Sequence, residues 1–312
     1  MKYIFSLISF FLSNVIFAQS NYSIDTSYTI KKTYTKLIKD YPFITIAESQ
    51  KNTNVTQISD VVYNEGKKRA LHFDAFIYKI KKRNPAVIMI HGGGWKSGNK
   101  NQMEALAKII ASKGYSCFAI EYRLSLEAKY PEGIYDVKNA IKFIKDNARK
   151  FNVDPDKIAI LGCSSGGQMA ALIGTTNEDS AFDDPTNNSK CSSKVNAIIN
   201  IDGILAFRHP ESSEGEVASF WLGGSYEENP ENWKNASALS HTNKNTVPIL
   251  FINSSIPRFH AGRDDMIKIL NQYKIYNEFH TIENSPHSFW FFQPWFDETV
   301  NYTTLFLDKI FK

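Results

Sequence analysis

The chain has 312 residues, of which 43% are hydrophobic and 22% are charged, an ordinary composition for a soluble globular protein. This length fits one large α/β domain or two small ones, and no Pro/Ser/Gly-rich linker or internal repeat divides the chain. The formal net charge of +4 is modest and spread along the sequence, so we expect no nucleic-acid partner. No spacing of Cys and His residues indicates a metal site, and we expect no cofactor.

The first residues have the pattern of a secretory signal peptide. Lys2 provides a positive start, residues 3–17 are almost all apolar, and the small residue Ala18 ends the run. A retained membrane anchor is the alternative, but the run is slightly short to span a bilayer. We therefore expect residues 1–18 to be removed. Residues 19–312 would then form a single domain that is secreted or periplasmic and not attached to a membrane.

Two predicted strands lead into a glycine-rich loop. Residues 71–78 alternate as an early antiparallel strand would, and residues 86–90 form a continuous apolar run typical of a buried strand. Residues 91–95 then read HGGGW. Glycines directly after a strand leave backbone N–H groups uncovered, which suits stabilisation of the oxyanion formed in acyl transfer. Gly93 and Gly94 are the candidate donors.

A second motif lies where a buried strand meets a helix. Residues 157–161 read KIAIL, residues 162–166 read GCSSG, and a helical stretch follows. The G-x-S-x-G pattern is typical of a sharp turn that exposes a serine beside a base, and the glycines permit that turn. Ser164 is the candidate nucleophile, and the N–H of Ser165 is a further candidate oxyanion donor.

The chain has three cysteines, an odd number that cannot pair completely within one molecule, although an oxidising compartment permits one disulfide. Cys117 lies in a strand-like run and is expected to be a buried apolar residue. Cys163 occupies the variable position of the G-x-S-x-G motif. The glycines centre the motif on Ser164, so we do not expect Cys163 to be the nucleophile.

These segments resemble an α/β-hydrolase of the esterase/lipase type with an HGGGW oxyanion loop. Residues 121–124, which read EYRL, and the later pairs Tyr130-Pro131 and Asp136-Val137 are similar to a further segment of that group. The resemblance covers roughly residues 60 to 312 and is nearest to secreted bacterial carbohydrate esterases, which remove acetyl or feruloyl groups from plant polysaccharides. It implies the α/β-hydrolase fold with a small cap insertion, and Trp95 at the end of the loop is a candidate substrate-binding residue.

The apolar patterns predict alternating strands and helices. The strands lie near residues 86–90, 115–121, 157–161, 195–201, 248–253 and 276–282, and the helices near 101–113, 134–150, 166–174, 264–272 and 294–311. This order demands a mostly parallel central sheet with helices on both faces. Sites in such sheets collect at the carboxyl ends of the strands, where both motifs lie.

His287 is the candidate general base. It directly follows the last predicted strand, as the chain order serine, acid, histidine requires. His72 lies among core residues of the early strand, which we expect at the sheet edge, and His91 belongs to the glycine-rich loop.

The acid of the triad is open between two residues. The resembled esterases usually carry an Asp a few residues after the penultimate strand, but residues 249–258 hold no acid. Asp202 directly follows the strand at 195–201, which is an alternative acid position in some lipases. It would otherwise be a turn residue.

Asp264 is the second candidate acid. It begins a predicted helix, with Asp265 behind it, and would reach His287 if the loop at residues 259–262 folded over the sheet. Asp is also a favoured residue at a helix N-terminus, so Asp264 has an ordinary structural explanation.

The chain between residues 202 and 247 is longer than a simple crossover needs. Residues 215–222 read as a helix with an apolar face, and an insertion at this point often forms a cap over a hydrolase site. Trp221 could face that site or serve packing alone.

Two arginines and a histidine, Arg258, His260 and Arg263, cluster in one loop at the expected rim of the site. Arginine offers paired donors that suit carboxylates, so an acidic sugar such as a uronic acid is a plausible neighbour of the scissile ester. Alternatively, the arginines pair with nearby acids, namely Asp264, Asp265 or Glu283.

The sequence therefore predicts a secreted serine esterase that forms an acyl-enzyme. Its substrate would be a small-molecule or oligosaccharide ester, such as an acetyl or feruloyl ester of pectin or xylan. A serine peptidase of the same fold is one alternative, because a triad does not distinguish an ester from an amide. A non-catalytic binding protein on a hydrolase scaffold is the other, favoured only by the absent acid at the usual place.

Overall fold

A central β-sheet organises the computed structural model, which describes residues 25–312 except 50–51, 67, 82 and 178. The predicted signal peptide lies outside the described residues. The sheet contains β2 (Val55–Asn64), β3 (Leu71–Tyr78), β4 (Asn84–Ile90), β5 (Ser116–Ile120), β6 (Val153–Cys163), β7 (Ala197–Ile201), β8 (Ile249–Ser254) and β9 (Asn277–Ile282). These eight strands are ordered β2-β3-β5-β4-β6-β7-β8-β9. Only the β2–β3 and β3–β5 pairs are antiparallel, so the sheet is mostly parallel as predicted.

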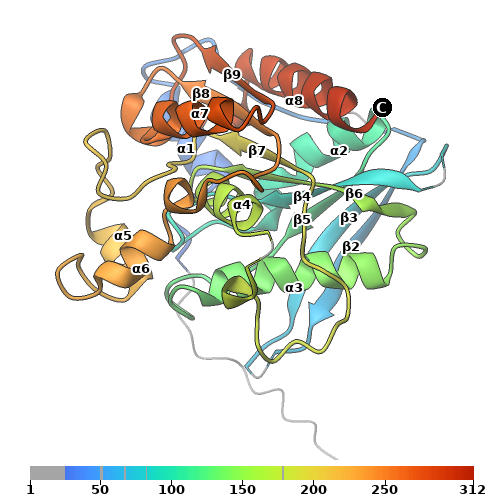
Figure 1. The fold of residues 1–312 in the computed structure, drawn as a ribbon. Helices are drawn as coiled ribbons and strands as arrows, with labels where there is room; N and C mark the ends of the chain where they lie inside the picture. Colours follow the sequence, from blue (N-terminus) through green and yellow to red (C-terminus); the bar gives the residue numbers. More distant parts are fainter. Residues whose placement is uncertain (1–24, 50–51, 67, 82, 178) are drawn as a thin grey trace, which may run out of the picture.

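Helices cover both faces of this sheet (Figure 1). One face carries α3 (Glu132–Asp146), α4 (Ser165–Thr175) and α7 (Arg263–Gln272). The other carries α1 (Ile30–Leu37), α2 (Glu104–Ser112) and α8 (Trp295–Phe311). Each face buries its own apolar cluster, which explains why the central strands read as continuous apolar runs rather than as alternating ones.

The edge of the sheet differs from the prediction. We expected the strand at 71–78 to be an edge strand, but β2 pairs with it on the outside. Much of β2 is exposed or half-buried, and its pairing with β3 is interrupted between Ile58 and Val61. A polar, irregular edge strand has little apolar periodicity, so the sequence pattern did not reveal it.

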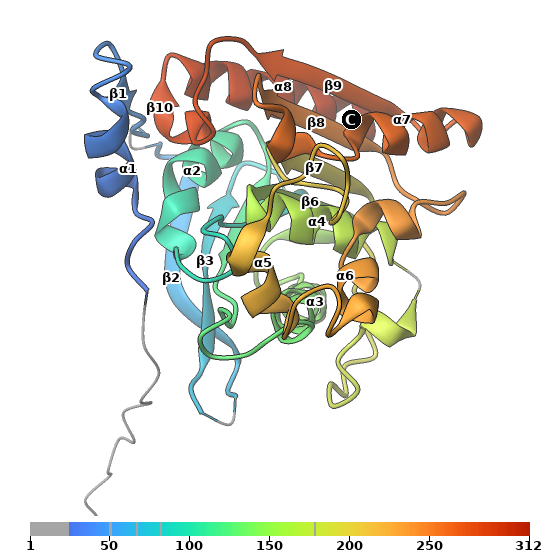
Figure 2. The ribbon, with the colours of Figure 1, turned by 90° about the vertical axis from the view of Figure 1, so that its left-hand side faces the viewer.

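The segment at residues 25–47, called the N-terminal arm below, lies along the side of the molecule that carries α2 (Figure 2). A bridge joins Asp25 to Ser97 beyond the glycine-rich loop. Farther along, β1 (Thr45–Ile46) pairs antiparallel with β10 (Phe292–Gln293), just before α8. The arm therefore spans two loops that are nearly 200 residues apart in the chain.

The predicted insertion lies between β7 and β8 and contains α5 (Gly215–Leu222) and α6 (Pro230–Asn235). Both helices face the viewer in Figure 2, in front of the sheet. No helix in the described residues is long and apolar enough to cross a membrane. In this part of the chain all three cysteines, Cys117, Cys163 and Cys191, are free.

Candidate active site

Ser164 sits on a strained turn between β6 and α4. Its backbone has φ 54° and ψ −124°, a conformation that few non-glycine residues adopt. The turn is possible because glycines flank it. A Cβ on Gly162 would lie 1.9 Å from the carbonyl oxygen of Gly166, and a Cβ on Gly166 would lie 2.3 Å from that of Ile90. The sequence thus dictates a sharp corner that presents the Ser164 hydroxyl above the sheet.

A continuous hydrogen-bonded chain links Ser164, His287 and Asp202. Ser164 Oγ lies 2.8 Å from Nε2 of His287. Nδ1 of the same imidazole lies 2.8 Å from Oδ2 of Asp202, whose carboxylate is completely buried. Ser164, His287 and Asp202 follow β6, β9 and β7, and loops at the carboxyl ends of these strands bring them together although β8 lies between β7 and β9.

The carboxylate of Asp202 has two further donors, both from Ser254. Oδ1 accepts from the backbone N–H at 2.8 Å, and Oδ2 accepts from the hydroxyl at 2.7 Å. These bonds compensate the cost of burying a charged group. Ser254 ends β8, next to the place where the resembled esterases carry their acid. Here Ser254 instead binds the carboxylate of Asp202, which follows the neighbouring strand β7.

The other candidate acid is engaged elsewhere. Asp264 accepts a bond from Nε of Arg263 at 2.8 Å, and its side chain is 65% exposed in the first turn of α7. Asp265 pairs with Lys268 and His209. The structure therefore gives Asp202, and not Asp264, as the partner of His287, because the start of α7 directs its acids toward solvent.

The glycine-rich loop runs directly against the nucleophile. A Cβ on Gly92 would come within 3.0 Å of Cβ of Ser164. Gly93 and Gly94 have φ of 129° and 60°, and the Gly93 carbonyl accepts bonds from the N–H groups of the following turn. Ser165 is the first residue of α4, where a backbone N–H has no acceptor within the helix. Gly94 and Ser165 both line the cavity beside Ser164, which is where donors to an oxyanion would be needed.

His91 supports this loop from below. It is buried, and its ring stacks on Tyr122 at a centroid distance of 4.6 Å. Its Nδ1 lies 2.9 Å from the carbonyl oxygen of Gly92, and the Tyr122 hydroxyl donates to the carbonyl of His91. Burial lowers the pKa of His91 to about 4, so the imidazole is neutral around pH 7.

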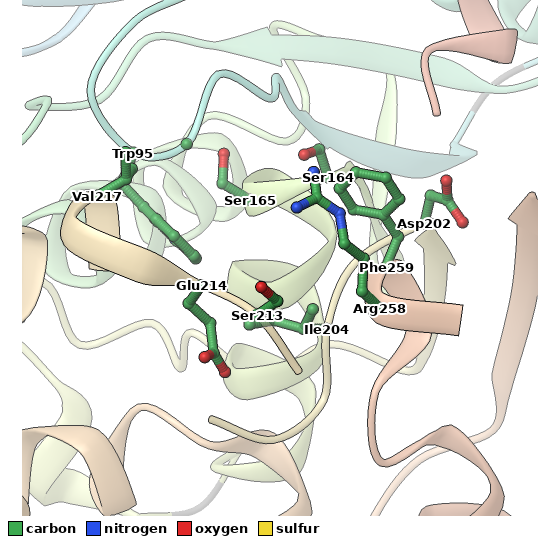
Figure 3. A pocket seen from close by; sticks show the side chains of 11 residues that line it. Trp95, Ser164, Ser165, Asp202, Ile204, Ser213, Glu214, Val217, Arg258 and Phe259 are labelled. Carbon is green, nitrogen blue, oxygen red and sulfur yellow. The ribbon is translucent and has the colours of Figure 1, made fainter. Parts of the chain in front are cut away.

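A cavity of about 180 Å³ opens beside Ser164 (Figure 3). The insertion contributes one wall through Ser213, Glu214 and Val217. The 3₁₀ turn Pro257–His260 contributes Arg258 and Phe259. The remaining lining residues are Gly94, Trp95, Ser164, Ser165, Asp202 and Ile204.

Aromatic rings hold the imidazole of His287 in place. The Phe259 ring stacks on it with centroids 3.4 Å apart and planes 9° from parallel. Trp290 meets the same imidazole edge-on at 5.2 Å. Beyond Phe259, the guanidinium of Arg258 lies 4.4 Å from the phenyl centroid. The resulting column of Arg258, Phe259 and His287 was not visible in the sequence, because only the fold places these side chains against one another.

The expected substrate-binding residues have different positions. Trp95 lines the cavity, but its indole is largely buried, stacks on Trp221 at 4.7 Å and donates to Gln168. Trp221 therefore serves packing. Arg258 lines the cavity as expected.

Arg263 and His260 do not line the cavity, contrary to expectation. The guanidinium of Arg263 donates to Asn253 and Asp264 and lies over the ring of Phe279. His260 is buried. Arg258 and His260 lie in the turn Pro257–His260 and Arg263 begins α7, and the sequence does not reveal which of the three faces the cavity. In the described residues, no group of His, Cys, Asp and Glu side chains could hold a metal ion.

The BD-FAE family model matches residues 74–274 of the chain. The chain belongs to the BD-FAE family. The matched region begins within β3 and ends just after α7, so it includes Ser164 and Asp202 but stops before His287.

Two curated relatives illustrate the similarity. Esterase LipC of Mycobacterium tuberculosis is 31% identical over 196 residues, which is 60% of this chain and 46% of LipC. Arylesterase of Saccharolobus solfataricus is 39% identical over 95 residues, 30% of this chain and 31% of that protein. The chain thus matches less than half the length of each of these relatives.

Solved structures share the α/β-hydrolase fold over most of the chain. A truncated form of a carbohydrate esterase from gut microbiota has a TM-score of 0.68 at 22% identity, covering 84% of this chain and 99% of that one. Esterase 2 of Thermogutta terrifontis, in its apo form, has a TM-score of 0.70 at 21% identity, covering 84% and 97%. The bifunctional GH43-CE protein of Bacteroides eggerthii has a TM-score of 0.72 at 24% identity, covering 82% and 38%. The fold class predicted from the sequence is confirmed.

Proposed function

We propose that this protein is a serine esterase that hydrolyses carboxylic esters through an acyl-enzyme. The observation that carries the proposal is the unbroken chain from Ser164 Oγ through His287 to the buried carboxylate of Asp202. The activities named for the relatives, esterase and arylesterase, support the same reaction class.

The geometry suits the two halves of ester hydrolysis. Nε2 of His287 takes the proton of Ser164 as Oγ attacks the ester carbonyl, and the resulting oxyanion accepts bonds from the N–H groups of Gly93, Gly94 and Ser165. The imidazolium then gives its proton to the departing alcohol, leaving the acyl group on Ser164. Water repeats the sequence, releasing the acid and restoring the serine. Asp202 holds the imidazole tautomer that leaves Nε2 free to accept the first proton.

The substrate we propose is an acylated plant polysaccharide or oligosaccharide, an acetyl or feruloyl ester of pectin or xylan. The names of two structural neighbours, a carbohydrate esterase and a GH43-CE protein, support a sugar ester. The cavity of about 180 Å³ is small beside the roughly 300–1,000 Å³ typical of small-molecule sites. This size favours a short acyl group such as acetyl. Hydrolysis rates on acetylated and feruloylated fragments of both polysaccharides test that preference.

We also propose export, because residues 1–18 have the composition of a signal peptide. Mass spectrometry of the protein recovered from the periplasm or the medium should give a chain that begins at Gln19. An intact N-terminus on a membrane-bound protein would contradict this proposal.

The decisive experiment compares Ser164→Ala with Cys163→Ala on p-nitrophenyl acetate. Loss of the nucleophile should lower kcat by several orders of magnitude, whereas the cysteine change should have little effect. Cys163 is fully buried, and burial raises the pKa of its thiol well above the usual range, so it is no nucleophile. A dead cysteine variant beside an active serine variant would overturn the proposal.

An aminoacyl-anilide substrate distinguishes the esterase from a serine peptidase of the same fold. We expect the ester to be cleaved and the anilide to be spared. A binding protein would leave both substrates intact. The only feature in favour of a binding protein was the absent acid after the penultimate strand, and Asp202 removes that argument.

A further inference from the structure

Arg258 is a cation on the wall of the catalytic cavity without an acidic partner. Arg263 pairs with Asp264, but the structure records no ion pair between Arg258 and any residue that it describes. Figure 3 shows the Arg258 guanidinium reaching into the cavity on the side of Ser164. Its donors are therefore available to a ligand in the cavity.

The guanidinium is also held in a defined place. It rests on the Phe259 ring at 4.4 Å, and that ring rests on the imidazole of His287 at 3.4 Å. Stacking on an aromatic face orients a guanidinium plane and leaves its edge donors free for a carboxylate. Arg258 is thus less free than an ordinary exposed arginine.

This column fixes which part of an ester Arg258 would meet. His287 must return its proton to the departing alcohol oxygen, so the alcohol lies beside the imidazole. Phe259 and Arg258 extend from that imidazole. A group carried by the alcohol therefore passes the guanidinium, whereas the acyl group stays on Ser164.

We propose that Arg258 forms a subsite for a carboxylate on the alcohol portion of the substrate. The alcohol would be an acidic sugar or another hydroxy acid, and Arg258 would donate charge-assisted hydrogen bonds to its carboxylate. This inference rests on the esterase activity proposed above and adds a charge preference to it.

Besides Asp202, which is paired with His287, one further acid lines the cavity and opposes this preference. Glu214 comes from the insertion, and its carboxylate accepts from the backbone N–H of Arg208. In Figure 3 the Glu214 carboxylate is turned away from the guanidinium. Glu214→Gln should therefore increase the preference for an acidic substrate and should not remove it.

The test uses matched pairs of acetyl esters that differ by one charge. 4-Acetoxybenzoate is compared with its methyl ester, and acetylated galacturonate with acetylated galactose. The first pair represents a small hydroxy acid and the second an acidic sugar, so the arms distinguish the two sources of the carboxylate. For each pair the acidic-to-neutral ratio of kcat/KM is measured in the parent and in Arg258→Ala.

Arg258→Ala should lower this ratio about tenfold in at least one pair, mainly through KM on the acidic ester. Arg258→Lys should keep part of the preference, since it retains the charge without the paired donors. Lys244→Ala, which removes an exposed cation that does not line the cavity, is the matched charge control and should leave the ratio unchanged. In the parent, added salt should reduce the preference, because salt screens an exposed charge pair.

The outcomes separate this proposal from the one on which it rests. If the parent cleaves no neutral ester, the esterase proposal fails. If it cleaves neutral esters but Arg258→Ala and Lys244→Ala change the ratio equally in both pairs, the subsite fails and the esterase proposal stands. A parent ratio that does not respond to salt also overturns the subsite, whatever the stability of the variants.

Discussion

The carboxylate of Asp202 is buried and surrounded by three donors, the imidazole N–H of His287 and both donors of Ser254. Asp202→Asn replaces an acceptor oxygen by an amide donor, which favours the wrong imidazole tautomer. We expect kcat on p-nitrophenyl acetate to fall roughly 10⁴-fold with little change in KM. Asp264→Asn is the control and should remain close to the parent, because the Asp264 side chain is largely exposed and pairs with Arg263. Equal, small losses in the two variants would contradict the assigned acid.

Ser254 donates two hydrogen bonds to that carboxylate and does not line the cavity. Ser254→Ala removes the hydroxyl donor to Oδ2 and keeps the backbone donor to Oδ1. Loss of one hydrogen bond to a charged group costs about 1.5–3 kcal/mol, part of which should appear as a roughly tenfold lower kcat. Ser255→Ala, at the exposed next position, should have no such effect. The test measures kcat of both variants on the same ester. Equal values of kcat would show that the Ser254 hydroxyl does not position the Asp202 carboxylate.

The sequence could predict Ser164 and His287 because each is marked by its immediate neighbours. A glycine-framed turn between strand and helix marks the serine, and the position after the last strand marks the histidine. The acid has no such local mark. Whether Asp202 or Asp264 meets the imidazole depends on where the chain after β7 and after β8 directs its acids, and only the folded structure shows that the start of α7 turns Asp264 toward solvent. The sequence likewise did not show where the side chain of Arg263 points. Arg263 begins α7 just after the turn that contains Arg258, and the fold alone decides which of the two faces the cavity.

The N-terminal arm joins the glycine-rich loop to the loop at residues 283–291, called the histidine loop below because it carries His287. Tyr28 Oη lies 2.9 Å from Oγ of Ser288, the residue after His287, and Gln102 donates to the Tyr28 carbonyl. Ala47 N–H donates to the Phe291 carbonyl farther along the same loop. The arm precedes residues 74–274, the region matched by the family model, and the loop that it contacts follows that region.

Tyr28→Phe should therefore loosen the histidine loop. The variant loses the hydroxyl contact to Ser288 and keeps the ring, at a cost of about 1 kcal/mol. We expect faster amide hydrogen exchange at residues 284–293 and a several-fold lower kcat. Tyr34→Phe is the control within the arm, because Tyr34 contacts Phe292 through its ring. Unchanged exchange in Tyr28→Phe would show that the arm does not restrain the loop.

The buried parallel strands were predictable from their apolar runs, whereas β2 and the N-terminal arm were not. The parallel strands β4, β6, β7 and β8 are buried along most of their length and read as apolar runs. The arm has no such pattern. None of the residues in α1 is buried, and β1 has only two residues. The position of the arm therefore depends on the pairing of β1 with β10. Pairing between segments so far apart in the chain produces no pattern in the local sequence from which it could be predicted.

At the scale of the whole molecule, buried and half-buried histidines make stability depend on pH. Burial lowers the pKa of His91 to about 4 from its ordinary value of 6.5, and burial lowers the pKa of His241 and His260 as well. In the unfolded chain these imidazoles take up protons as the pH falls through about 6.5. The folded protein resists that uptake, so protons favour unfolding. Stability is therefore retained above pH 6.5 and lost progressively between pH 6.5 and 4.

His91→Gln isolates the contribution of one imidazole. The shift at His91 corresponds to about 3 kcal/mol lost between pH 6.5 and 4, and a glutamine does not titrate. The variant should be less stable than the parent at pH 7, because it loses the stacking on Tyr122. The difference in unfolding free energy between the two proteins should then shrink as the pH falls, since only the parent loses the contribution of His91. Urea unfolding of both proteins at pH 7, 5.5 and 4.5 measures this convergence. Because His241 and His260 are present in both, their effects cancel, and a constant difference across the series would mean that His91 titrates as it does in the unfolded chain.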